Sequence, residues 1–220
     1  MDQPVTRIVV RPIASPLTLA FLALAVGTFT VAGAELRWIP PAQDGYAGLA
    51  VLIFVVPLQA LGSVYGFLAR DSIAGTGTGL LAGGWLVTGT LTFLSHRGNP
   101  LAALGLVLLA VATTLLVPAA VGAASKPLAS LVITGAALRF YLTAAYELSG
   151  GADWKYAAAA EGLLLALLAL YAALAFELED NRLHTVLPTL RRGIGRQAMS
   201  GSSADELGQV VHEAGVRRQL

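Results

Sequence analysis

The chain has 220 residues, of which 56% are hydrophobic and only 12% are charged. A typical soluble domain carries about 25% charged residues, so a water-soluble fold of this composition would expose large apolar patches. The formal net charge of +1 gives no indication of a nucleic-acid partner, and the absence of cysteine excludes disulfides and thiolate chemistry. The composition therefore predicts a protein of the lipid bilayer.

Six apolar segments follow one another along the chain, each long enough to cross a bilayer as a helix of about 20 residues. They are residues 12–34, 45–69, 72–96, 98–125, 127–150 and 156–179. Their apolar runs are continuous rather than alternating, which favours helices over the strands of a barrel. The predicted fold is an all-α membrane protein, a bundle of six transmembrane helices joined by short loops.

The distribution of Lys and Arg predicts the orientation, because cytoplasmic loops are enriched in these residues. With an even number of spans, ten Lys and Arg lie on the side of the two termini and three on the other. The ten are Arg7, Arg11, Arg70, Lys126, Arg182, Arg191, Arg192, Arg196, Arg217 and Arg218; the three are Arg37, Arg97 and Lys155. We therefore expect a multi-pass protein of the inner (plasma) membrane with both termini in the cytoplasm.

Three parts are expected along the chain: a cytosolic N-terminus (1–11), the six-helix membrane domain (12–179) and a cytosolic tail (180–220). In the tail, Ser203 and Glu206 have the spacing of a capping box, and apolar residues follow at helical spacing. A short amphipathic cytosolic helix is the prediction for this segment. A frayed polar tail that packs on nothing is the alternative.

The third span carries Gly75, Gly79 and Gly83, which lie four residues apart on one helix face. Small residues at this spacing let a neighbouring helix approach closely. The glycines are therefore expected at a helix–helix contact, while Thr76 beside them is a candidate for the lining of a solute path. The alternative for the glycines is that their bare backbone lines a narrow pore, and the alternative for Thr76 is a role in packing alone.

The second span contains Pro57, Gln59 and Ser63. Proline removes one helical hydrogen bond and leaves a carbonyl group of the preceding turn without its donor. An amide at mid-membrane depth is costly unless it has a partner. Gln59 and Ser63 are thus candidates for a polar strip along a solute path, and the alternative is that Gln59 bonds to an adjacent helix.

Arg139 lies about 12 residues into the fifth span, close to the membrane midplane at about 1.5 Å per residue. A charge at this depth is expensive and must face the bundle with a partner. Glu147 on the same helix and Glu161 on the next helix are the expected partners. Arg139 is a candidate for attracting a carboxylate substrate or for coupling protons with Glu161; the alternative is a buried structural ion pair.

Motifs of catalysis or metal binding are absent from the sequence. His96, His184 and His212 are scattered, and neither HExxH nor G-x-S-x-G occurs. We therefore expect neither an enzyme nor a cofactor or metal site.

Several short motifs, in this order, resemble the acetate uptake transporter family, the succinate–acetate/proton symporters of the YaaH or SatP type. The motifs are Ala14-Ser15-Pro16-Leu17-Thr18-Leu19, Gln59, Arg70-Asp71-Ser72, Thr76, Trp85, Tyr171-Ala172-Ala173, Glu177-Leu178-Glu179-Asp180 and Thr185-Val186-Leu187-Pro188. The resemblance covers about residues 14–190. It indicates a member that has diverged from the usual pattern of the family.

The resemblance implies a proton-coupled transporter or a channel that takes up small monocarboxylates such as acetate. It also implies a hexamer in which each protomer holds its own path. By spacing, the apolar ring that narrows the family's pore falls at Leu22, Leu81 and Ala136, where its aromatic members are missing. A non-transporting membrane scaffold or accessory subunit, with a partner-binding cytosolic tail, is the alternative function.

Overall fold

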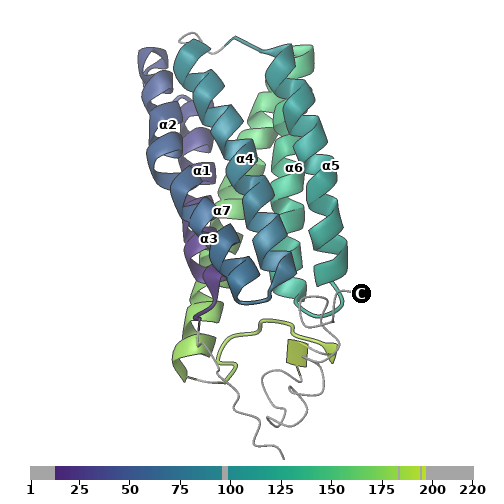
Figure 1. Ribbon diagram of the computed structural model, residues 1–220. Coiled ribbons are helices and arrows are strands. Elements are labelled where there is room, and N and C mark those ends of the chain that lie inside the picture. The colour runs from purple at the N-terminus through teal and green to yellow at the C-terminus, as the bar shows by residue number, and fades with distance from the viewer. Residues whose placement is uncertain (1–12, 96–98, 183, 194, 197–220) are drawn as a thin grey trace, which may run out of the picture.

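The computed structural model describes residues 13–95, 99–182, 184–193 and 195–196. Within them, six helical spans run up and down in one bundle (Figure 1). The helices are α1 (Pro16–Glu35), α2 (Asp44–Ala50) and α3 (Val56–Leu68), α4 (Ser72–Ser95), α5 (Ala102–Gly122), α6 (Pro127–Ser149) and α7 (Ala152–Arg182). The predicted six-helix membrane fold is confirmed.

The second membrane span is a continuous helix built from several segments. A short 3₁₀ turn, η1 (Pro41–Gln43), leads into α2, and a π-helical segment, η2 (Val51–Val55), joins α2 to α3. Pro57 follows directly, at the start of α3. Because proline has no N–H for the preceding turn, the wider π-helical turn accommodates the missing bond and keeps the span continuous.

Turn residues define the other helix ends. Pro16 and Pro127 open α1 and α6, positions at which the missing proline N–H costs nothing. The Asp71 carboxylate accepts a hydrogen bond from the Ala74 N–H at 3.1 Å and caps the first turn of α4. Gly150 ends α6 with a left-handed φ of 70°, so the chain turns at once into α7.

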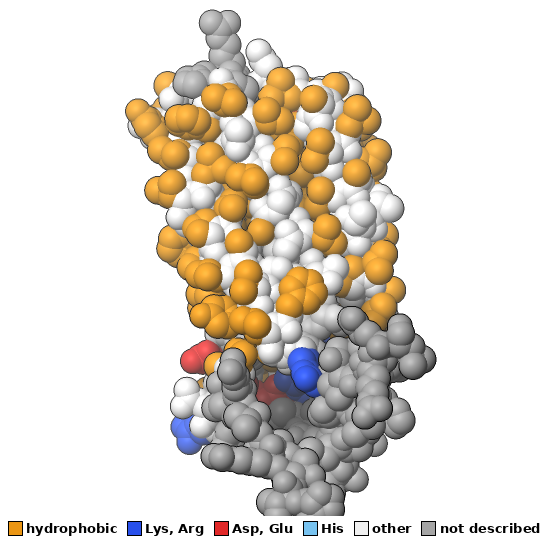
Figure 2. Space-filling model, in the orientation of Figure 1, with side chains coloured by type: hydrophobic (Ala, Val, Ile, Leu, Met, Phe, Trp, Pro, Cys, Tyr) orange, Lys and Arg blue, Asp and Glu red, His pale blue; other side chains and the backbone are white. Residues whose placement is uncertain are grey.

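The helices pack mainly in three pairs, α1 with α7, α3 with α4 and α5 with α6. Trp85, Phe21 and Leu24 are among the largest side chains buried between them. The outer surface is apolar as well, with Leu164 68% exposed, and Figure 2 shows hydrophobic side chains over most of the bundle's length. Helices that are apolar all round are those of a protein in lipid.

Two of the three ridge glycines lie at a helix contact, as predicted. A Cβ added to Gly75 would lie 2.8 Å from the Phe67 ring, and one added to Gly79 would lie 2.8 Å from the Ser63 hydroxyl, both on α3. Gly83 has no atom within 4 Å of such a Cβ. The ridge therefore joins α3 to α4 over its first two glycines only.

The first part of the segment predicted as a cytosolic tail lies against the end of the bundle. Helix α7 runs on to Arg182, and the next residues turn back beneath the bundle (Figure 1). We call residues 184–193 and 195–196 the strap. The strap contacts both α7 and the α5–α6 loop, where the Arg192 N–H donates to the Ser125 carbonyl at 3.2 Å. The amphipathic helix predicted from Ser203 lies outside the described residues.

Candidate substrate pathway

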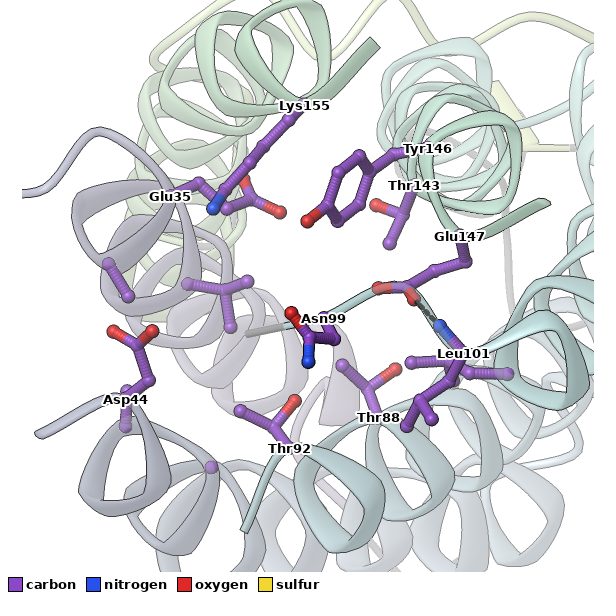
Figure 3. A pocket seen from close by; sticks show the side chains of 15 residues that line it. Glu35, Asp44, Thr88, Thr92, Asn99, Leu101, Thr143, Tyr146, Glu147 and Lys155 are labelled. Atoms are coloured by element: carbon purple, nitrogen blue, oxygen red, sulfur yellow. Dashed lines mark hydrogen bonds between the residues drawn. The ribbon is translucent and has the colours of Figure 1, made fainter. Parts of the chain in front are cut away.

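A polar opening of about 90 Å³ lies at the end of the bundle opposite the strap. We call it the vestibule. It is formed where α1, α4 and α6 end and where α2, α5 and α7 begin. Its polar lining residues are Glu35, Asp44, Thr88, Thr92, Asn99, Thr143, Tyr146, Glu147 and Lys155 (Figure 3). Since one water occupies about 30 Å³ in the liquid, this volume suits a few waters or one small organic acid.

A second, smaller cavity of about 10 Å³ lies against the floor of the vestibule. The two share Val31, Thr88 and Thr143 as lining residues. Trp85 and Phe140 also line the small cavity, with ring centroids 5.4 Å apart in an edge-to-face contact. The volume is close to the minimum for one water. We call this small cavity the constriction.

Arg139 lines the constriction and pairs with Glu35, not with the partners predicted from the sequence. Its Nη2 lies 2.7 Å from Glu35 Oε2, and its Nη1 donates to the Thr143 hydroxyl at 3.0 Å. The arginine side chain is 2% exposed and that of Glu35 is 12% exposed. The expected partnership with Glu161 or Glu147 is therefore corrected, because the acid in contact comes from α1, 104 residues away.

Gly162 explains how the arginine reaches across the bundle from α6. A Cβ added at this position of α7 would lie 3.0 Å from Arg139 Nε and 3.4 Å from the Ala32 Cβ of α1. The contact with Nε is tighter than most Cβ contacts, so a larger residue would make the arginine shift by a few tenths of an ångström. Glycine therefore leaves room for the guanidinium beside α7.

The two acids expected beside Arg139 have other surroundings. The Glu147 carboxylate accepts a hydrogen bond from the Leu101 N–H at 2.5 Å and so stabilises the N-terminus of α5, where negative charge is favourable. Glu161 lies against Gly135 of α6, and its buried Oε2 has no hydrogen-bond partner among the described residues. Their roles in anion or proton coupling remain predictions.

The rim of the vestibule carries charges of both signs. Arg37 and Asp44 form an ion pair at 3.1 Å, and the Lys155 ammonium lies 5.5 Å from the centre of the Tyr146 ring. Figure 3 shows Lys155 and Glu35 pointing into the same opening. The vestibule lining therefore holds three carboxylates and one ammonium, with the Arg139 guanidinium in the constriction below.

The six path residues predicted from the sequence line neither the vestibule nor the constriction. Leu81 and Ala136 are buried, Thr76 is exposed, and Leu22 is 43% exposed in a groove between α1 and α7. Gln59 is buried and donates to the Ala20 carbonyl at 3.4 Å, while Ser63 donates to the Gly75 carbonyl at 2.7 Å. Both amide and hydroxyl thus bond to adjacent helices; their part in a path stays a prediction.

The aromatic residues missing at the expected ring occur one helical turn further along. Trp85 lies four residues after Leu81 on α4, and Phe140 lies four residues after Ala136 on α6. Residues four apart share a helix face, so these two aromatic side chains lie one turn nearer the vestibule than the predicted ring positions. Trp85, Thr88 and Thr92 also share that face, which is the signal by which sequence reasoning could have found this part of the lining.

The strap end of the bundle is held together by a second set of polar contacts. The Glu179 carboxylate, 1% exposed, accepts from Arg191 Nε and Nη2, with 2.5 Å to Nη2. Thr185 and Thr189 donate to the same carboxylate. Lys126 and Asp71 form an ion pair between the two neighbouring loops.

The fold and this pathway define a class: a polytopic α-helical membrane protein with a polar opening that narrows inside a single chain. No protein-family model matches the chain, and no curated protein matches it in sequence. Among solved structures it is similar to one described as the bacterial acetate channel SatP. The TM-score is 0.70 at 19% identity, over 81% of this chain and 99% of that chain. The chain has the fold of that channel.

Proposed function

We propose that this protein lets small monocarboxylates such as acetate cross the membrane through the vestibule and constriction of each chain. The observation that supports this most is the polar vestibule ending at buried Arg139, within a fold similar over nearly the whole length of an acetate channel. An anion loses much hydration in a narrow apolar passage. A guanidinium at the floor offsets part of that loss.

Proton coupling belongs to the same proposal. The neutral acid crosses an apolar constriction more easily than the anion, so uptake is expected to increase with an inward proton gradient. A hexamer in which each chain has its own path is the expected assembly. In the alternative, a scaffold with no transport, the vestibule would be a solvated end of the bundle only.

Uptake of radiolabelled acetate into proteoliposomes tests the function directly. Vesicles are compared with and without an inward proton gradient, and protein-free vesicles measure the diffusion of acetic acid through lipid. We expect acetate uptake above the level of protein-free vesicles. This excess uptake should be larger with the proton gradient than without it. Uptake equal to that of protein-free vesicles under both conditions would favour the scaffold.

A matched pair of variants on α1 locates the path. Val31 lines both cavities, whereas Val26 is 44% exposed on the outer surface. Val31→Phe narrows the floor of the vestibule and should lower acetate uptake several-fold, while Val26→Phe adds the same volume outside and should leave uptake unchanged. Equal uptake by the two variants would place the path elsewhere.

The orientation follows from the Lys and Arg distribution and puts the vestibule outside. Reporter fusions after Leu220 and within the loop at residues 40–44 should report opposite sides, with the terminus in the cytoplasm. Signals from the same side would contradict the topology. Signals from opposite sides with the terminus outside would make the vestibule a cytoplasmic opening.

A further inference from the structure

Arg139 is a buried cation whose hydrogen bonding is incomplete. A guanidinium has five N–H donors and binds a planar carboxylate best through two parallel bonds. Here Glu35 contacts Nη2 alone, Thr143 accepts from Nη1, and the buried Nε has no acceptor among the described residues. The arginine is thus held by a single carboxylate contact in a place where full pairing would be expected.

The ion pair also lies across the boundary between the two cavities. Glu35 lines the vestibule and Arg139 lines the constriction, so the 2.7 Å contact joins one to the other. The side chain of Glu35 is the more exposed of the two, and Figure 3 shows its carboxylate pointing into the opening. A solute that enters from the vestibule reaches Glu35 before it reaches the guanidinium.

The contacts of the other charged groups nearby are with groups other than the Arg139 guanidinium. Glu147 is bonded to the N-terminus of α5, Asp44 is paired with Arg37, and Lys155 lies over a tyrosine ring. Glu161 on α7 interacts with Arg139 through its charge, but its buried Oε2 has no hydrogen-bond partner among the described residues. Among the described residues, one carboxylate therefore occupies the guanidinium, and it is the one that faces the vestibule.

We infer that Arg139 and Glu35 form an exchange site, in which the carboxylate of a small monocarboxylate solute displaces Glu35 and takes its place on Arg139. The inference rests on the proposed function for the identity of the solute. Glu35 is then an internal competitor: its carboxylate neutralises Arg139 when no solute is present and moves into the vestibule when one binds. No bond other than hydrogen bonds forms or breaks.

Binding of nitrate to the purified protein in detergent tests the site without transport. Nitrate is a small planar oxyanion that stays ionised, so changes in its binding cannot come from its own protonation. Glu35→Gln removes the competing charge and keeps the side-chain shape. It should bind nitrate about tenfold or more tightly than the unaltered protein by calorimetry, since close desolvated charge pairs are coupled by at least this much.

Three further variants decide whether the effect belongs to Arg139. Glu35→Asp shortens the competitor and should give intermediate affinity, which keeps the test usable if Glu35→Gln folds poorly. Glu35→Gln combined with Arg139→Gln removes both charges of the pair and should lose the tight nitrate binding. Asp153→Asn removes one exposed negative charge at the same end of the bundle, and should bind nitrate like the unaltered protein.

The inference is overturned if Glu35→Gln and Glu35→Asp bind nitrate no more tightly than the unaltered protein, or if tight binding persists in the double variant. Acetate should compete with nitrate in Glu35→Gln; failure to compete would remove the carboxylate from the proposed ligands. The two experiments test the exchange site and the proposed function separately. Acetate uptake with unchanged nitrate binding rejects the site alone, and Arg139-dependent nitrate binding without uptake rejects the function alone.

Discussion

Two buried arginine–glutamate pairs lie at opposite ends of this bundle, and they differ in how completely the acid and the base are paired. At the strap end, Glu179 accepts from two nitrogens of Arg191 and from two threonines. At the vestibule end, Arg139 has one contact with Glu35, an unpartnered Nε and a cavity beside it. The first pair is saturated and closes an end of the bundle, whereas the second leaves the Nε donor of Arg139 without an acceptor among the described residues.

The largest effect on stability is expected at the saturated pair. Arg191→Ala strands the carboxylate of Glu179, which is 1% exposed, and should cost about 3 kcal/mol, the lower part of the range for a stranded buried charge because the two threonines remain. Thermal unfolding in detergent measures it. Arg192→Ala is the matched control, since this residue's contact is through its backbone N–H and its side chain is exposed. Equal melting temperatures for the two variants would contradict the strap's structural role.

Breaking the Arg139–Glu35 pair should lower the free energy of unfolding by less. Arg139→Met strands Glu35, which can take up water from the vestibule, so a loss of about 2 kcal/mol is expected. Combining it with Glu35→Leu should restore the melting temperature, because both members of the Arg139–Glu35 pair are then replaced by apolar side chains. Combining Arg139→Met with Glu161→Leu should not restore the melting temperature. Rescue by Glu161→Leu and not by Glu35→Leu would restore the partner predicted from the sequence.

The glycine ridge provides a comparison within one helix. Gly79→Leu forces Ser63 away and should cost about 1–2 kcal/mol, in the lower part of the range for overpacking. Gly83→Leu meets no atom within 4 Å and should change the stability of the protomer by no more than about 0.5 kcal/mol. Melting temperature and size in mild detergent are measured together. A smaller particle for Gly83→Leu alone would show that this face contacts another protomer.

The smallest effect is expected for a threonine pair on α6. Thr143→Val removes the hydrogen bond from Arg139 Nη1 and the one that the Thr143 hydroxyl donates to the Arg139 carbonyl, and should cost about 1 kcal/mol. Thr134 is exposed and bonds only to the preceding turn of its own helix, so Thr134→Val should be close to neutral. Double-variant cycles with Arg139→Met measure the coupling. Equal coupling for both threonines would contradict the structural distinction between them.

Local chemistry accounts for the features that the sequence predicted correctly. Six spans follow from six apolar runs, because each helix must satisfy its own backbone hydrogen bonds in lipid whatever its neighbours are. Gly75 and Gly79 were expected at a contact because a bare helix face favours close approach. That Arg139 must face the interior with a partner followed from the cost of an unpaired charge at its depth.

Tertiary structure alone decided which groups meet. Sequence reasoning sought partners for Arg139 on its own helix and the next one, but side-chain pairing depends on how helices are arranged around the bundle. Gly162 opens a route past α7, so the partner is Glu35 from α1. The vestibule likewise gathers residues from the ends of six helices, and the strap reaches Glu179 only because the chain turns back after α7. Hydropathy is a property of each segment by itself, whereas a site is a property of their packing.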